Sequence, residues 1–156
     1  MSLKKTGKKP VFWRLLWWIY LLCLFVLVVV KFNGSFSALK DRIAFYSSPD
    51  VIRYNLIPFR SLALQLRHLN AYWAVRNLLG NIIPFIPFGF LMPKAFGKIK
   101  TFGKVWAVSA PVIVGIELFQ YLTRLGSLDI DDFILNMTAV AIGYGFQKAF
   151  RHRNLG

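Results

Sequence analysis

The chain has 156 residues, of which 56% are hydrophobic, and it carries a formal net charge of +14. So large an apolar share excludes an ordinary soluble domain, and the length indicates a single domain, residues 1–156. The basic residues stand in short clusters between apolar runs, which argues against a nucleic-acid partner and is typical of a membrane protein. The single cysteine, Cys23, excludes an intrachain disulfide and a cysteine metal cluster.

The first apolar run covers residues 11–30 and is long enough to cross a bilayer, since about 20 helical residues span the hydrocarbon core. Aromatic residues such as Trp17 and Trp18 crowd its start, as in the aromatic belt at a membrane interface. A cleaved signal peptide is the alternative, with a small-x-small site at Ser35 and Ser37. The run is longer than the usual signal-peptide core, so we expect a retained membrane span.

The first outer loop, about residues 31–71, contains a second helical pattern. Leu62, Leu66 and Leu69 recur at helical spacing with charged and polar residues between them. The spacing predicts an amphipathic helix over residues 61–73. Such a helix lies either on the outer leaflet, as an interfacial helix, or against the top of the helical bundle.

Three further apolar runs, at about residues 72–92, 102–122 and 130–150, complete a predicted set of four spans. The fourth is the weakest, because its uncharged core is short. Lysine and arginine clusters precede the first span, fill the gap between the second and third, and follow the fourth, and such clusters favour the cytoplasmic side. The sequence therefore predicts an all-α membrane protein with four transmembrane helices and both termini in the cytoplasm.

The acidic residues are concentrated around the third and fourth spans. Only six residues of the chain are acidic, and four of them are Glu117, Asp129, Asp131 and Asp132. Glu117 falls inside the third span, where a central charge costs roughly 2.5 to 3.5 kcal/mol on insertion scales. A charge kept at that cost usually faces protein or water, so Glu117 marks a candidate functional site.

Helical spacing adds polar partners from the same region. Glu117, Gln120 and Arg124 are spaced i, i+3, i+7, which predicts one shared helical face. Asn136 follows Asp132 by four residues on the next helix and shares its face.

The second span brings two amides and two prolines. Asn77 and Asn81 are four residues apart and therefore share a face. Pro84 and Pro87 follow, and each removes a helical hydrogen bond. The pattern predicts a bent helix with a polar cavity beside the bend.

The polar residues of the three spans are predicted to lie at a similar depth in the membrane. At 1.5 Å per residue, Asn81, Glu117 and Asn136 lie about 6 to 10 Å below the outer surface. The sequence therefore predicts a polar pocket open to the outside or to the outer leaflet. Its candidate residues are Asn77, Asn81, Glu117, Gln120, Arg124, Asp129, Asp131, Asp132 and Asn136.

Each of these residues also has a structural explanation. Asn and Gln side chains hydrogen-bond across membrane helices, and an aspartate at a helix N-terminus needs no further function. The coincidence of several polar residues on three helices at one depth favours a functional pocket.

These motifs, in this order, resemble the VanZ-like family of small bacterial membrane proteins, named for a teicoplanin-resistance protein. The matching segments are residues 54–59, 76–90, 117–120, 124, 129–132 and 136. One departure is visible, because residues 137–141 stand where the family often has a glycine-rich step. The resemblance implies a bacterial cytoplasmic-membrane protein and reduced susceptibility to lipid-anchored glycopeptides, and it brings no settled catalytic activity.

Two functions from different classes fit the residues. In the first, a non-enzymatic envelope protein binds the head group of a lipid or a lipid-linked wall precursor. In the second, an enzyme acts on such a lipid, with Glu117 as general base or Asp129, Asp131 and Asp132 holding a divalent cation such as Mg²⁺. The chain has no Ser-His-Asp set, no paired His ligands and no phosphate-binding glycine loop, which favours the first, and no cofactor is expected. A small transporter is a third hypothesis. Four helices would have to dimerise to form a path for a substrate across the membrane.

Overall fold

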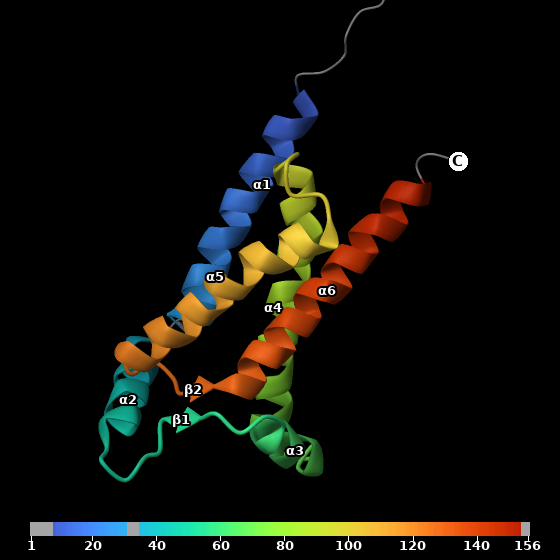
Figure 1. Ribbon diagram of the computed structural model, residues 1–156. Helices are drawn as coiled ribbons and strands as arrows, with labels where there is room; N and C mark the ends of the chain where they lie inside the picture. The colour runs from blue at the N-terminus through green and yellow to red at the C-terminus, as the bar shows by residue number, and fades with distance from the viewer. Residues whose placement is uncertain (1–7, 31–34, 154–156) are drawn as a thin grey trace, which may run out of the picture.

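The structure, a computed structural model, describes residues 8–30 and 35–153 (Figure 1). The described residues are mostly helical, with one short strand pair. The elements in chain order are α1 (Lys8–Leu24), the π-helical segment η1 (Phe25–Val29), α2 (Phe36–Ser47), β1 (Tyr54–Asn55), α3 (Arg60–Arg67), α4 (Tyr72–Ala95), α5 (Phe102–Leu122), β2 (Leu128–Asp129) and α6 (Ile130–Arg153).

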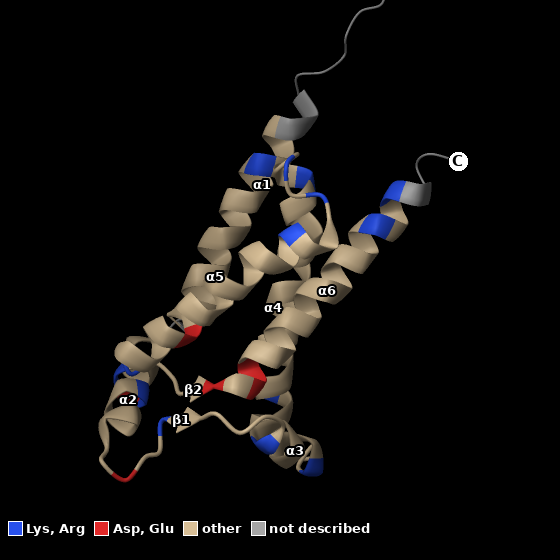
Figure 2. Ribbon diagram, viewed as in Figure 1, with Lys and Arg blue, Asp and Glu red and all other residues tan. Residues whose placement is uncertain are grey.

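Four long helices run up and down, and the short elements gather at one end. The start of α1, the α4–α5 connection and the end of α6 share one end of the molecule, whereas α2, α3, β1 and β2 lie at the other (Figure 1). The pair α4 and α6 makes the most extensive contact, followed by α1 on α4 and α5 on α6. Basic residues occur at both ends, but the acidic residues all lie toward the end with the short elements (Figure 2).

Three of the predicted spans match helices that are long and apolar enough to cross a membrane. These segments are Val11–Val29, Tyr72–Ala95 and Phe102–Leu122. The fourth predicted span, residues 130–150, coincides with α6, which begins with two aspartates and ends with basic residues. It is not among these three segments, so a fourth membrane crossing stays a prediction.

Glycine allows α4 and α6 to pack closely. A Cβ added at Gly143 would lie 2.9 Å from the carbonyl carbon of Ile86, and one at Gly89 would lie 2.8 Å from that of Val140. Buried side chains such as Phe85 complete the contact. Gly143 is buried in this contact, whereas Gly145 is exposed with open space around it.

The prolines of α4 lie inside a continuous helix. The hydroxyl of Tyr20, from α1, donates a hydrogen bond of 2.7 Å to the carbonyl oxygen of Pro84. Trp17 packs nearby, with its ring 4.9 Å from that of Phe88. The groove found at Pro87 is lined by apolar side chains, and a polar cavity beside the bend stays a prediction.

The outer loop has more structure than the sequence predicts. The expected helix over residues 61–73 is interrupted, because α3 ends at Arg67 and Trp73 belongs to α4. The helix α2 and the two-residue parallel strands were not predicted, so the purely α-helical fold is wrong in that detail. In α3, Gln65 is buried and Leu62 is half-buried, whereas Leu64 and Leu66 are exposed.

Candidate functional site

The loop between α5 and α6 is joined to the first outer loop by two short parallel strands. Tyr54 pairs with Leu128, and Asn55 pairs with Asp129. The backbone N–H of Leu128 donates to the carbonyl of Arg53 at 2.8 Å. This pairing places the Asn55 side chain against the acidic motif at residues 129–132.

Asp129 caps α6 and also holds the outer loop. Its Oδ1 accepts from the backbone N–H of Asp131 at 2.9 Å, the usual bond of an N-cap residue. The same oxygen accepts from Asn55 Nδ2 at 3.0 Å, and Oδ2 accepts from the Ser61 hydroxyl at 2.5 Å. Asp129 thus links the start of α6 with β1 and α3.

Asp131 caps a different helix, α3. Its carboxylate accepts from the backbone N–H of Phe59 at 2.5 Å and of Leu62 at 3.0 Å. Phe59 has a φ of 66°, a left-handed conformation that is uncommon for a bulky residue. Asp131 is 0% exposed. The hydrogen bonds from the two N–H groups at the N-terminus of α3 therefore replace those that its carboxylate would make to water.

Asp132 connects α6 with α4. Its Oδ1 accepts from Asn81 Nδ2 at 2.5 Å. One helical turn further along α6, Asn136 is 1% exposed, and its Oδ1 accepts no hydrogen bond within the described residues. Asn81 of α4 therefore contacts the acidic motif directly, and Asn136 continues the same face of α6.

The α5 helix contributes two buried polar side chains. Glu117 is 4% exposed and Gln120 is 2% exposed. Gln120 Nε2 donates to the carbonyl of Val28, near the end of η1, at 2.7 Å. Since α5 packs on α6, Glu117 lies in the protein interior rather than toward lipid. Convergence of Glu117 with Asn81 and Asn136 in one pocket stays a prediction.

Two predicted pocket residues lie elsewhere. Because α5 ends at Leu122 and Arg124 adopts a left-handed φ of 61°, Arg124 does not continue the helical face of Glu117 and Gln120. Its side chain is exposed and donates to the Ser47 hydroxyl of α2 at 3.0 Å. Asn77 is also exposed on α4, although it shares the spacing of Asn81.

Sequence reasoning missed three residues of this junction. Asn55 and Ser61 bind Asp129 as described, and Arg53 stacks over the Tyr121 ring at 4.5 Å while donating to the Tyr121 carbonyl. The available signal was Asn55 itself, since it lies in the outer-loop motif at residues 54–59. Its partner is 74 positions away in the chain, and no local pattern identifies such a pair.

The acidic motif is a poor match for a metal centre. Within the part of the chain that the structure describes, no group of three His, Cys, Asp or Glu side chains is arranged to hold a metal ion. Asp129, Asp131 and Asp132 instead accept hydrogen bonds from three different sets of partners. A divalent cation at these residues stays a prediction.

Two arginines lie near each other at the same end. Burial lowers the pKa of Arg42 on α2, and the positive charge of Arg76 on α4 lowers it further. Arg42 is half-buried, and its Nε has no hydrogen-bond partner among the described residues. Paired cations with an unused donor suit an anionic group.

Comparison with known proteins gives one family and one curated relative. The family model described as VanZ/LLP1 matches residues 17–151. The relative is Protein VanZ of Enterococcus faecium, which is 28% identical over 109 residues, covering 66% of this chain and 66% of the relative. The chain therefore spans just under two thirds of that relative's length. No solved structure matches the chain.

Proposed function

Since the chain belongs to the VanZ/LLP1 family, we propose that it is an envelope protein of the bacterial cytoplasmic membrane that binds a lipid head group or a lipid-linked wall precursor. Binding takes place in a polar pocket at the outer leaflet and lowers susceptibility to lipoglycopeptides such as teicoplanin. The protein acts in this role by binding, without catalysis.

The proposal rests on the buried polar side chains of α5 and α6. They lie next to the acidic junction, which is the contact of the acidic motif at residues 129–132 with the first outer loop and α4. Asn136 has a buried Oδ1 that accepts no hydrogen bond within the described residues, and an unsatisfied buried acceptor costs about 1–3 kcal/mol. A hydroxyl or amide of a ligand would remove that cost. Glu117, buried on the neighbouring helix, supplies a charged acceptor for sugar or peptide donors of the same head group.

The arginines supply the complementary charge. The positive charge of Arg76 lowers the pKa of Arg42. They lie on the helices α2 and α4, at the end of the molecule that we place outside the cell. A phosphate or pyrophosphate head group would pair with these cations while its neutral part meets the buried acceptors.

The proposal requires α6 as a fourth span, both termini in the cytoplasm and α3 at the outer leaflet. In a chain with Cys23 replaced by serine, we expect a membrane-impermeant thiol reagent to label Asp50→Cys and Ser127→Cys in intact cells. Lys98→Cys should react only after the membrane is opened, because it lies in a basic connection on the cytoplasmic side. Labelling of Lys98→Cys from outside would contradict this topology.

Glu117→Gln tests the proposed function in cells. Neutralising Glu117 removes the membrane penalty of its charge, so the protein level should hold or rise slightly. Protection against teicoplanin should fall, because charge-assisted hydrogen bonds are about twice as strong as neutral ones. Susceptibility to teicoplanin and to vancomycin is measured in a sensitive host that expresses each variant.

The matched control is Leu118→Ala, one residue further along α5 with a side chain that is 43% exposed. At equal membrane levels, checked by blot, Leu118→Ala should protect as well as the wild type. A Glu117→Gln protein with wild-type protection would make Glu117 a structural residue and contradict the proposed role.

A further inference from the structure

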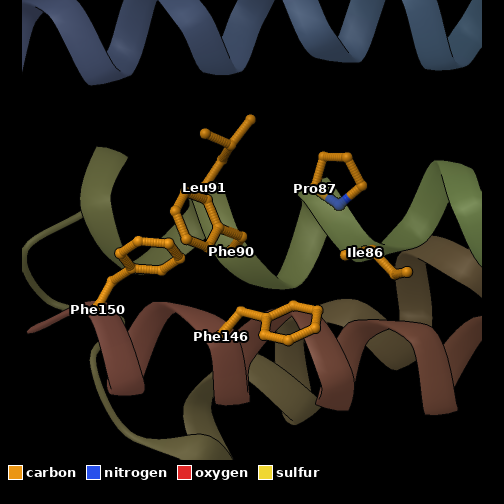
Figure 3. Close-up of a pocket in the computed structure, with 6 residues that line it drawn as sticks. All are labelled: Ile86, Pro87, Phe90, Leu91, Phe146 and Phe150. Carbon is orange, nitrogen blue, oxygen red and sulfur yellow. The ribbon is translucent and has the colours of Figure 1, made fainter.

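A groove without polar side chains opens between α4 and α6, away from the acidic junction (Figure 3). Its volume is about 380 Å³. The lining residues are Ile86, Pro87, Phe90, Leu91, Phe146 and Phe150. Figure 3 shows the Phe150 ring in the space between α4 and α6, whereas Pro87 and Leu91 project from α4 toward α1. The groove is lined by α4 and α6 alone and is chemically suited to a hydrocarbon chain.

A cationic side chain, Lys94, stands at one end of this groove. Lys94 lies one helical turn after Phe90, and its ammonium nitrogen is 4.2 Å from the centroid of that ring and 4.1 Å from the Trp13 ring. On α6, Lys148 and Arg151 are exposed near the same end of the molecule, but their helical spacing places them on other faces than Phe146 and Phe150. Figure 2 shows basic residues and no acidic residue at this end of α4 and α6. The groove thus combines an apolar wall with a positively charged end.

We propose that this groove binds an anionic phospholipid from the leaflet at the basic end of the molecule. One acyl chain lies along Phe90, Phe146 and Phe150, and the phosphate lies at Lys94. Basic pockets between membrane helices on the cytoplasmic side are suited to anionic head groups. The aromatic rings hold the Lys94 ammonium by cation–π contact, so the charge is already positioned at the groove.

A second copy of the chain suits this groove less well. Membrane dimers are mostly related by a two-fold axis, which brings the same patch of both copies together. Lys94 of one copy would then approach Lys94 of the other, and like charges at an interface are unfavourable. An anionic lipid removes that repulsion.

The test is native mass spectrometry of the full-length protein in detergent, with phosphatidylglycerol and phosphatidylcholine of identical acyl chains as probes. We expect the wild type to retain phosphatidylglycerol preferentially. Lys94→Gln should lower that preference about fivefold, the factor corresponding to about 1 kcal/mol for one cation near a membrane surface. Lys104→Gln is the matched control, since Lys104 is an exposed lysine at the same end but on α5, and it should leave the preference unchanged.

A photoreactive phosphatidylglycerol with its reactive group in the acyl chain locates the site. Crosslinks should concentrate at residues 86–91 and 146–150, and Phe146→Ser should weaken retention of both lipids without changing their ratio. Equal retention of the two lipids by the wild type, or an unchanged preference in Lys94→Gln, would overturn the proposal. So would crosslinks spread evenly along the exposed face of α1, or a protein dimer that excludes both lipids. None of these results depends on the outer-leaflet pocket.

Discussion

Gly143→Ala is expected to destabilise the fold by about 3 kcal/mol, the upper part of the range for overpacked interiors. The added methyl group would overlap the carbonyl of Ile86 and would lie 3.0 Å from the backbone nitrogen of Phe90. These are backbone atoms of α4, so they cannot move aside as a flexible side chain does. Relief requires the two helices with the most extensive contact in the molecule to separate. Thermal unfolding of the purified protein in detergent measures the loss.

Gly145→Ala is the matched control, two residues further along the same helix. No heavy atom lies within 4 Å of a Cβ built at Gly145. Alanine is a better helix former than glycine by up to about 1 kcal/mol, so this variant should unfold at the wild-type temperature or slightly above. Equal destabilisation of the two variants would show that close packing of α4 and α6 is not what position 143 requires.

Asp131→Ala should detach the first outer loop from the bundle, at a cost of about 3 kcal/mol. The substitution removes both oxygens that satisfy the backbone N–H groups of Phe59 and Leu62. Each buried donor left unsatisfied costs about 1–3 kcal/mol. Without its cap, α3 should fray and Phe59 should leave its left-handed conformation. Limited proteolysis within residues 48–71, together with the unfolding temperature, measures the effect.

Asp131→Asn should give an intermediate result, because the amide keeps one acceptor oxygen. Asp50→Ala is the control, since Asp50 is an exposed acidic residue of the same loop, and it should change neither readout. A loop equally resistant to protease in the wild type and in Asp131→Ala would contradict the assignment of Asp131 as the cap of α3.

The long helices were predictable because a helix that crosses a bilayer needs about 20 apolar residues, so the length of each apolar run indicates a span. The predicted starts at residues 72 and 102 coincide with those of α4 and α5. The end of α4 lies at Ala95, three residues beyond the predicted boundary, because three prolines are accommodated inside the helix. The Tyr20 hydroxyl of α1 adds a hydrogen bond from a neighbouring helix to the Pro84 carbonyl in this stretch.

Features of the outer loop were not predictable, because they depend on contacts between distant segments. The strand pair joins Asn55 with Asp129 and needs only two residues from each segment. The shared face of Glu117 and Arg124 failed for a local reason, since the helix ends at Leu122 and the backbone then turns left-handed without a glycine at that position. Periodicity alone gave no sign of that end.

The acidic motif at residues 129–132 now divides into roles that spacing could not separate. Asp129 and Asp131 cap α6 and α3 and bind the outer loop. Asp132 instead faces Asn81 of α4, one turn before the buried Asn136. We therefore expect substitutions of Asp131 to act on folding, whereas changes at Glu117 act on ligand binding with the fold preserved.

The most direct measurement is the dissociation constant of purified protein for a lipid-linked wall precursor, compared between the wild type, Glu117→Gln and Leu118→Ala in the same detergent. Loss of a hydrogen bond to a charged acceptor is worth about 1.5–3 kcal/mol, so Glu117→Gln should raise the dissociation constant by about ten- to a hundredfold. Leu118→Ala should bind as the wild type does. Equal dissociation constants for all three proteins, each folded to the same extent, would contradict a head-group site at the buried polar residues of α5 and α6.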